Sequence, residues 1–276
     1  MSVSDGPVLV TGGTGTLGRK VVGQLLEREQ AVRVLSRRRR PVHEGAADTP
    51  VPQWATGDLT TGQGLDAAVA GVSSIVHCAT SGSRKDIDGT RALIEAVRRA
   101  GESPHLVYIS IVGVDRVPFF YYRAKLAVER IVQDSGLPWT ILRTTQFHDL
   151  VARVTTVQRR LPFTLYPAGM SAQPIEVGEV AQRLVELVLG APAGRVTDMG
   201  GPEVRTVREL AQLTLRAYGL RRPVLPVPLP GKAASAYRAG HHTTPEHSVG
   251  SATYAEYLTA ATAGPHVGRS GAGGEA

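Results

Sequence analysis

The 276-residue sequence contains a single cysteine, Cys78, and this scarcity excludes two kinds of site. One thiol cannot build an intramolecular disulfide framework or a zinc site that needs several thiolates. Long apolar runs are also absent, since no segment approaches the length of a membrane span, and Met1 to Pro7 is too polar and short for a signal peptide core. We therefore expect a soluble, cytoplasmic protein with no membrane partner.

The charge balance is basic, with a formal net charge of +7 and a pI of about 9.8. Such a balance can indicate nucleic acid, but the sequence has no recognisable helix-turn-helix and no interleaved aromatic and basic surface. Much of the excess is arginine, including the run Arg37 to Arg40, and an anionic small molecule would account for part of it. Nucleic acid is not an expected partner.

Short apolar runs alternate with helical patterns through the first half of the chain. This alternation predicts an α/β protein with a Rossmann-type, doubly wound parallel sheet covered on both faces. The strands are expected at 8–10, 31–35, 51–56, 74–78, 105–110 and 139–142, and the helices at 19–29, 65–69, 86–100 and 121–135.

The pattern loosens after residue 150, where proline and glycine become frequent. We expect a helix ended by Gly190, a strand at 195–199 that returns to the sheet, a capping box that opens a helix at Thr206, and an extended segment at 223–230. The predicted division is a core at 1–150, a small C-terminal substrate-binding lobe at 151–262 and a disordered tail at 263–276.

A glycine-rich loop follows the first strand and precedes the first helix. Glycines at 12, 13, 15 and 18 satisfy both G-x-G-x-x-G and G-x-x-G-x-x-G. Glycine permits φ > 0 and a close backbone approach, and the N–H groups at a helix start attract phosphate. The loop therefore predicts a dinucleotide site, whose contacts we assign to Gly12, Thr14, Gly15, Thr16, Leu17 and Gly18.

The end of the second strand bears on the choice of dinucleotide. An NAD site places an acidic residue there, whereas this chain has Ser36 followed by Arg37 and Arg38. A guanidinium can bind the 2′-phosphate of NADP with charge-assisted hydrogen bonds, so Arg37 predicts NADP(H). The alternative for this arginine run is a solvated basic loop.

Two further loops follow strands and are expected at the same crevice. Asp58 and Leu59 would lie near the adenine, and Cys78, Ala79 and Thr80 near the ribose and diphosphate. A purely structural role for Cys78, as a small buried apolar residue, is the alternative.

Tyr121 and Lys125 are four residues apart and share one face of an expected helix. An ammonium beside a phenol can lower its pKa and bind a cofactor ribose, and a phenol tuned in this way can exchange the proton that accompanies hydride transfer. An ordinary surface pair is the alternative.

These motifs together resemble an atypical short-chain dehydrogenase/reductase of the NmrA-like, NAD(P)H-binding family. The resemblance covers about residues 6–260 and rests on the loop 11–18, Arg37, Gly57-Asp58-Leu59, Tyr121 with Lys125, the segment 139–143 and Gly200-Gly201-Pro202-Glu203. It implies an NADPH-dependent oxidoreductase that acts on a carbonyl or quinone-like small molecule. It equally admits a sensor that binds NADP(H) without turnover, as a monomer or homodimer.

The chain departs from this family in two places. The wider superfamily carries a polarising serine just past the fifth strand, whereas here Ser110 ends that strand and Ile111 follows. The sixth strand usually continues Arg-Pro, and this chain has Arg143-Thr144. Ser110 is nevertheless assigned to the catalytic set with Tyr121 and Lys125.

Other side chains offer weaker signals. Phe147 and His148, just beyond the sixth strand, are expected to contact substrate, and Asp149 lies beside them. For His148 and Asp149 a structural hydrogen bond is the alternative. Phe119, Phe120 and Phe163 would line an apolar pocket or pack in the core. His241, His242 and His247 lack carboxylate spacing and are expected in an exposed loop, so no metal site is predicted.

Overall fold

The computed structural model describes residues 6–38 and 50–263. Two sequence-based expectations fall outside these ranges, namely the contribution of Arg39 and Arg40 to the basic run and the tail at 264–276. Within the described residues no helix is long and apolar enough to span a bilayer.

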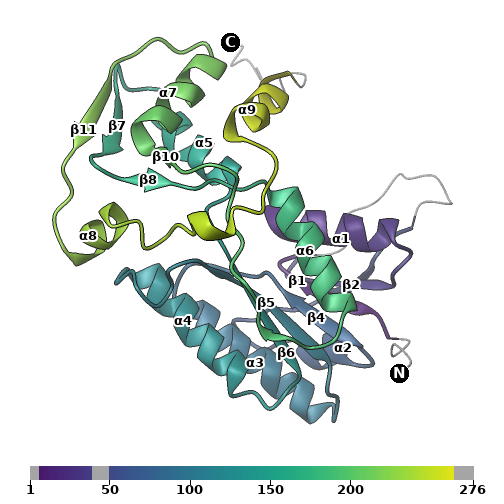
Figure 1. Ribbon diagram of the computed structural model, residues 1–276. Helices are drawn as coiled ribbons and strands as arrows, with labels where there is room; N and C mark the ends of the chain where they lie inside the picture. Colours follow the sequence, from purple (N-terminus) through teal and green to yellow (C-terminus); the bar gives the residue numbers. More distant parts are fainter. Residues whose placement is uncertain (1–5, 39–49, 264–276) are drawn as a thin grey trace, which may run out of the picture.

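A parallel sheet of seven strands organises the described part of the chain (Figure 1). The sheet extends on both sides of its first strand, β1. The chain first adds β2 and β3 on one side and then returns to add β4 on the other side. The point between β1 and β4 is therefore the topological switch point, where ligands of such sheets bind. In spatial order the strands are β3 (Gln53–Thr56), β2 (Val32–Ser36), β1 (Val8–Thr11), β4 (Ser74–His77), β5 (His105–Ile111), β6 (Trp139–Thr144) and β9 (Gly194–Arg195).

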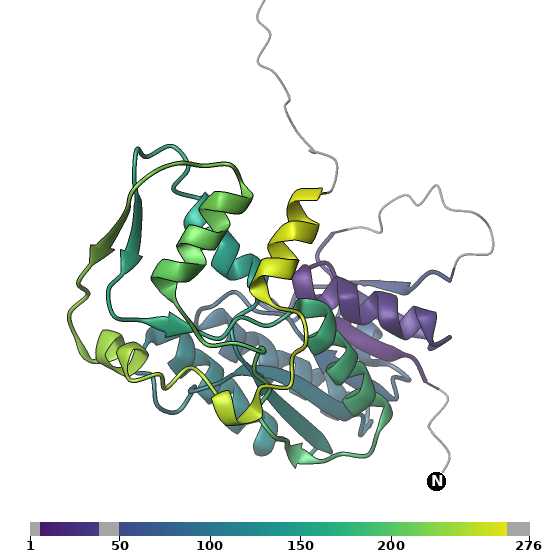
Figure 2. The same cartoon turned by 45° about the horizontal axis from the view of Figure 1, so that its top comes forward.

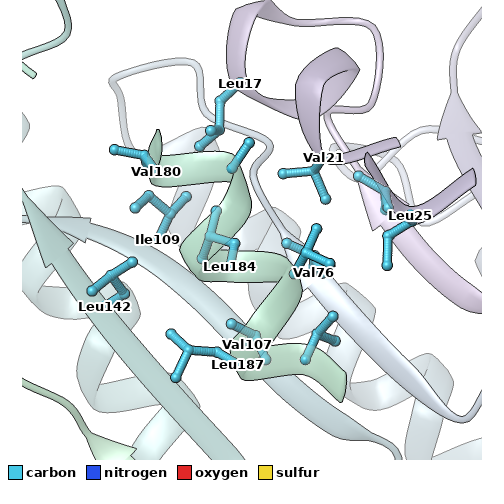
Figure 3. Packing of buried hydrophobic residues seen from close by; sticks show 14 of the residues in the cluster. Leu17, Val21, Leu25, Val76, Val107, Ile109, Leu142, Val180, Leu184 and Leu187 are labelled. Atoms are coloured by element: carbon cyan, nitrogen blue, oxygen red, sulfur yellow. The ribbon is translucent and has the colours of Figure 1, made fainter. Parts of the chain in front are cut away.

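Helices cover both faces of this sheet, which confirms the predicted α/β doubly wound class. One face packs against α1 (Thr16–Glu27) and α6 (Val177–Leu189), whose leucines and valines interdigitate over β4, β5 and β6 (Figure 3). The other face packs against α2 (Leu65–Val69), α3 (Lys85–Arg99) and α4 (Phe120–Gln133). The central strands β1, β4 and β5 are buried on both faces, which explains their continuous apolar runs.

The remaining elements form a lobe on one side of the sheet (Figures 1 and 2). Among the described residues, four α-helices, one short 3-10 helix and two small sheets build it, and α7 begins with the predicted capping box of Thr206 and Glu209. The elements are α5 (His148–Thr156), β7 (Thr164–Pro167), β8 (Ser171–Ala172), β10 (Arg205–Thr206), α7 (Val207–Ala217), β11 (Val224–Val227), α8 (Lys232–Arg238), the short 3-10 helix η1 (Pro245–His247) and α9 (Tyr254–Ala263).

The division between core and lobe is not a single cut at residue 150. Helix α6 packs along α1, and β9 pairs in parallel with β6, so both belong to the core layers. The returning strand expected at 195–199 forms only at its start, as β9 (Gly194–Arg195), with a further bridge between Thr144 and Met199. The chain thus enters the lobe, returns to the core and leaves again.

Candidate cofactor and active site

The glycine loop lies at the switch point and is shaped by close backbone contacts. Gly12 has φ +68°, and its carbonyl oxygen accepts a hydrogen bond of 2.9 Å from the Gly15 N–H. A Cβ on Gly12 would lie 2.7 Å from the nitrogen of Ala79, and one on Gly18 would lie 2.2 Å from the oxygen of Gly12. Glycine is therefore required at both positions by space, and at Gly12 also by conformation.

The first turn of α1 opens directly from this loop. Its N-cap is Gly15, and no side chain caps the helix, so the N–H groups of the first turn are free to bind an anion. Thr14, Gly15 and Thr16 are exposed, while Leu17 is buried in the core. A cradle lined with backbone and open to solvent is the geometry that a dinucleotide diphosphate needs, so the loop fits the expected cofactor.

A buried polar chain supports the loop from below. Thr11 Oγ1 lies 2.7 Å from His77 Nδ1, and His77 Nε2 lies 2.9 Å from Thr90 Oγ1. Burial, and to a smaller extent the charge of Lys125, lowers the pKa of His77 to about 4. His77 is therefore neutral at physiological pH and ties the ends of β1 and β4 to α3.

The segment after β4 runs beside the glycine loop. Ala79 contacts Gly12 and donates its N–H to Thr11 Oγ1 over 3.3 Å. Cys78 is half-buried against the core, and burial raises the pKa of its thiol to about 12, so it packs as a neutral side chain. Thr80 is exposed at this edge. The segment is placed to contact a bound dinucleotide mainly through backbone and Thr80.

Asp86, which the sequence reasoning missed, holds the next part of that segment in place. Its carboxylate accepts hydrogen bonds from the Thr80 hydroxyl, from the Ser81 backbone and hydroxyl, and from the Gly82 N–H. Burial acts to raise the pKa of Asp86, but these bonds outweigh it and the pKa is lowered. An acidic residue in the first turn of a helix was the only sequence signal for this role.

Arg37 and Asp58 differ in how free they are to bind a ligand. Arg37 is exposed just beyond β2 and makes no side-chain hydrogen bond or ion pair with the described residues. Asp58 is half-buried and its carboxylate accepts the Thr60 N–H at 2.8 Å, which stabilises its own turn. Leu59 packs against Gly89 on α3. The Arg37 side chain is therefore available for the predicted contact with a cofactor, whereas the Asp58 carboxylate already accepts a structural hydrogen bond.

Tyr121 lies in the first turn of α4, against the same segment. It is half-buried, and a Cβ on Gly82 would lie 3.4 Å from its ring. The expected lowering of its pKa by Lys125 is wrong in direction. Burial raises the pKa of Tyr121 and only a hydrogen bond with Thr80 acts against this, so the phenol stays protonated.

Lys125 points into the protein. It is 3% exposed, donates a hydrogen bond of 3.0 Å to the Ile109 carbonyl oxygen and lies 4.7 Å from the centre of the Tyr108 ring. Burial lowers the pKa of Lys125 to about 8, while Asp86 and Cys78 act in the opposite direction. A contact between Lys125 and a cofactor ribose remains a prediction.

Ser110 lies within β5, opposite Arg143 of β6. It is 1% exposed, and its hydroxyl oxygen has no hydrogen-bond partner among the described residues. The neighbouring Ile111 packs instead with Tyr121 and Tyr122. A buried hydroxyl without a partner agrees with the expectation that Ser110 lies one residue away from the position of the polarising serine in the wider superfamily.

The lobe contributes aromatic residues that the sequence reasoning did not select. Tyr237 of α8 meets Tyr122 edge-on at 5.9 Å and stacks obliquely on His242 at 4.5 Å. Phe119 and Phe120 lie exposed at the start of α4, with their ring centres 4.4 Å apart. Tyr237 packs in one cluster with Tyr121 although the two residues are more than a hundred positions apart, and no local pattern signals such a contact.

Phe147 is the N-cap of α5, and His148 is its first residue. Phe147 is half-buried against the core, and His148 is 1% exposed with its ring 5.1 Å from Tyr257 and 5.6 Å from Tyr254. His148 Nδ1 lies 3.4 Å from a carboxylate oxygen of Glu176. In this arrangement His148 offers no surface to a ligand, so its expected contact with substrate stays a prediction.

The three C-terminal histidines do not share an exposed loop. His242 is 2% exposed and its Nε2 lies 2.8 Å from the Ser171 carbonyl oxygen, so the expectation of exposure is wrong for this residue. His242 is buried because the segment 241–244 packs against the loop at Gly113, which is a tertiary contact. The described residues contain no group of three or more metal-ligand side chains.

Comparisons with known proteins agree with this geometry. Residues 12–189 match a family model described as NAD(P)H-binding. The chain is 28% identical over 216 residues to (4-alkanoyl-5-oxo-2,5-dihydrofuran-3-yl)methyl phosphate reductase of Streptomyces griseus, covering 77% of this chain and 74% of that protein. It is 27% identical over 255 residues to divinyl chlorophyllide a 8-vinyl-reductase of Zea mays, covering 83% of this chain and 63% of that protein.

A solved structure shows the same fold. The NADPH-dependent quinone oxidoreductase of Escherichia coli, complexed with NADPH, superposes with a TM-score of 0.77 at 17% identity over 92% of this chain and 99% of the other. The family match spans the glycine loop, the segment after β4, Tyr121 and Lys125. The protein therefore belongs to the NAD(P)H-binding family that its glycine loop predicted.

Proposed function

We propose that this protein is an NADPH-dependent oxidoreductase of the NmrA-like, short-chain dehydrogenase/reductase type, and that it reduces a carbonyl or quinone-like small molecule. One observation carries the proposal. The segment 79–82 contacts Gly12 of the phosphate cradle at one end and Tyr121 at the other, so the cofactor loop and a proton donor flank the same few residues.

In this proposal, different residues bind the cofactor and transfer the proton. The backbone at 12–18 would hold the diphosphate, and Arg37 the 2′-phosphate. When bound, NADPH supplies the hydride. Because burial raises the pKa of Tyr121, its hydroxyl keeps its proton and can donate it to the oxygen of a reduced carbonyl or quinone. This protonation state favours reduction as the direction of the reaction.

The chain's reductase relatives support this assignment, while the substrate is our inference. Tyr122 and Tyr237 pack with Tyr121 and give its surroundings an aromatic surface, which suits a planar apolar substrate. The single cysteine and the dependence on NADPH suit a cytoplasmic location.

A second candidate is a regulatory protein that binds NADP(H) without turnover. The unpartnered hydroxyl of Ser110 supports it, because a serine held inside β5 cannot polarise a substrate in the crevice. The two candidates share the same cofactor site and differ only in whether a hydride acceptor binds productively.

NADPH oxidation with a panel of quinones and aldehydes separates them. For the reductase we expect steady turnover, and Tyr121→Phe should lower kcat by roughly 10²- to 10⁴-fold, the range for loss of one general acid. The dissociation constant for NADPH should change little, since the phenol is placed at the substrate. Tight NADPH binding without turnover on any acceptor would instead establish the sensor.

A further inference from the structure

The positive charge of this chain is concentrated in two segments of the lobe. Segments 150–175 and 210–245 contain eight lysine and arginine residues and no aspartate or glutamate, whereas the rest of the chain is close to neutral. A cofactor site does not explain this concentration, because the glycine loop and Arg37 lie in the core.

The outer face of α5 combines this charge with exposed aliphatic side chains. His148, Ala152 and Thr155 point inward and are buried. On the opposite side, Leu150 and Val154 are about half exposed at 52% and 50%, with the exposed Arg153 between them. Aliphatic residues at helical spacing on a solvent-facing side indicate a surface that is covered by something else.

The same surface continues beyond the end of α5. Val157 is 73% exposed and Leu161 is 42% exposed, and a cavity of about 360 Å³ lies among Arg153, Thr156, Val157, Arg159 and Arg160. The Gln158 side chain bonds both the N–H and the carbonyl oxygen of Leu165, which joins this turn to β7.

Leu165 extends the surface onto the small lobe sheet. It is 39% exposed and lies directly beside Leu225 of β11, which is 41% exposed. Arg222 donates to the carbonyl oxygens of Gln158 and Leu161 and so holds the turn against the segment that leads into β11. We call this continuous surface the lobe face; it comprises Leu150, Arg153, Val154, Val157, Arg159, Arg160, Leu161, Leu165 and Leu225.

We propose that the lobe face docks peripherally on an anionic lipid bilayer. Arginines would contact lipid phosphates while the valines and leucines enter the boundary between headgroups and acyl chains. Such docking needs no membrane-spanning helix. It differs from the sequence analysis, which predicted no membrane partner. The proposal is independent of turnover, because no residue of the lobe face belongs to the candidate active site.

The chemistry of the face favours a bilayer over other anionic partners. Single-stranded nucleic acid is bound by basic residues with aromatic stacking platforms, whereas the exposed apolar residues here are aliphatic. Contacts with the phosphates of a duplex would use the arginines but leave these aliphatic side chains uncovered. A second copy of this chain would bring another set of arginines and no acidic residues to the interface, so like charges would repel. An anionic membrane satisfies both the aliphatic and the cationic side chains.

Vesicle co-sedimentation tests the proposal with the full-length protein. We expect binding to phosphatidylcholine vesicles that contain phosphatidylglycerol and none to pure phosphatidylcholine. Arg159→Glu with Arg160→Glu should weaken binding by at least about 30-fold, on the basis of the contribution of each basic residue near an anionic surface. Val157→Asp should weaken it on the order of tenfold or more by opposing insertion.

The matched control carries the same charge change on the other side of the molecule. Arg91→Glu with Arg130→Glu alters exposed arginines of α3 and α4 and should leave vesicle binding within about twofold of the parent, since distant exposed charges are screened. Unchanged NADPH affinity of each variant shows that it has folded.

Four outcomes would overturn the proposal. The first is that the parent protein does not bind vesicles with phosphatidylglycerol, and the second is that Val157→Asp binds them as well as the parent does. The third is that the control pair loses as much vesicle binding as the Arg159 and Arg160 pair. The fourth is that no protein binds vesicles and Val157→Asp instead converts a dimer into a monomer in sedimentation.

Discussion

The two sides of the switch point are built by different means. On the β1 side, a single stretch of eight residues forms a cradle whose shape comes from free backbone N–H groups and missing Cβ atoms. On the β4–β5 side, Lys125 and Ser110 are buried, and Tyr121 packs with Tyr237 of the lobe. Local backbone shape can bind a cofactor, whereas proton chemistry requires side chains assembled from distant segments.

The largest effect that would test the β1 side comes from adding a methyl group to its cradle. In Gly18→Ala the new Cβ would lie 2.2 Å from the Gly12 oxygen, so the loop must move. We expect NADPH affinity to fall by at least about 100-fold, which is about 2.7 kcal/mol. Calorimetric titration measures this directly.

The control for this variant is in the same helix. Gly23 has open space around its Cβ position, so Gly23→Ala should keep NADPH affinity and stabilise the fold by about 0.5–1 kcal/mol. If Gly18→Ala binds NADPH as well as Gly23→Ala does, the cradle does not depend on close packing.

Removing the buried ammonium is the corresponding test of the β4–β5 side. Lys125→Met keeps the aliphatic stem but removes the charge near Tyr108 and Asp86. If Lys125 assists catalysis, kcat should fall by about 100-fold, in the range of single proton-transfer or electrostatic groups.

A structural role for Lys125 predicts a different result. Loss of the hydrogen bond to the Ile109 carbonyl would lower the melting temperature and leave kcat of the folded fraction unchanged. Lys125→Arg, which retains the charge, serves as the comparison in both kinetic and thermal measurements.

Arg37 tests whether the cofactor side uses any side chain for specificity. Arg37→Ala should weaken NADPH by roughly 10- to 100-fold, which corresponds to about 1.5–3 kcal/mol for a charge-assisted hydrogen bond. NADH affinity should stay nearly constant, because it lacks the 2′-phosphate. Arg38→Ala controls for general loss of positive charge, and equal losses of NADPH and NADH in Arg37→Ala would exclude the proposed contact.

The smallest expected effect concerns His77, which joins β1 to α3 through its hydrogen bonds with Thr11 and Thr90. Because burial lowers the pKa of His77 to about 4, the unfolded chain takes up a proton near pH 6.5 while the folded protein does not. The stability due to neutral His77 is therefore present above pH 6.5 and is lost as the pH falls toward 4. We expect this loss to be about 1–2 kcal/mol after local relaxation.

Urea unfolding across this pH range measures the His77 contribution. His77→Gln, which cannot titrate, should be less stable than the parent near neutral pH but should lose less stability between pH 6.5 and pH 4. Parallel curves for the two proteins would show that His77 does not titrate in this window.

The core was predictable because its signals are local. Buried parallel strands require apolar runs, and the predicted helix at 65–69 matches α2 residue for residue. Helix α1 starts earlier than expected, at Thr16, because the glycine loop leads directly into it. The return of a strand near residue 195 was expected and is seen as β9, whereas the packing of α6 along α1 was not predicted, since a short apolar pattern does not specify its partner.

The candidate site was predictable in part for the same reason. Gly12 and Gly18 were selected from spacing, and their crowded Cβ positions supply the physical cause. The pKa direction of Tyr121 and the burial of His242 were predicted wrongly, because both depend on residues distant in sequence. Asp86 was missed although its contacts with residues 80–82 are local, because an acidic residue in the first turn of a helix does not by itself indicate that role. Tyr237 was missed because its contact with Tyr122 joins segments distant in sequence.

The amino-acid sequence by itself determined the α/β core and the NAD(P)H-binding loop of this protein, because strand burial and backbone approach impose composition and spacing on contiguous residues. Only the tertiary structure decided which side chains surround Tyr121, which charges are buried, and which lobe residues form one exposed aliphatic and basic face. Those properties depend on desolvation and on contacts between segments, and neither is encoded in local periodicity.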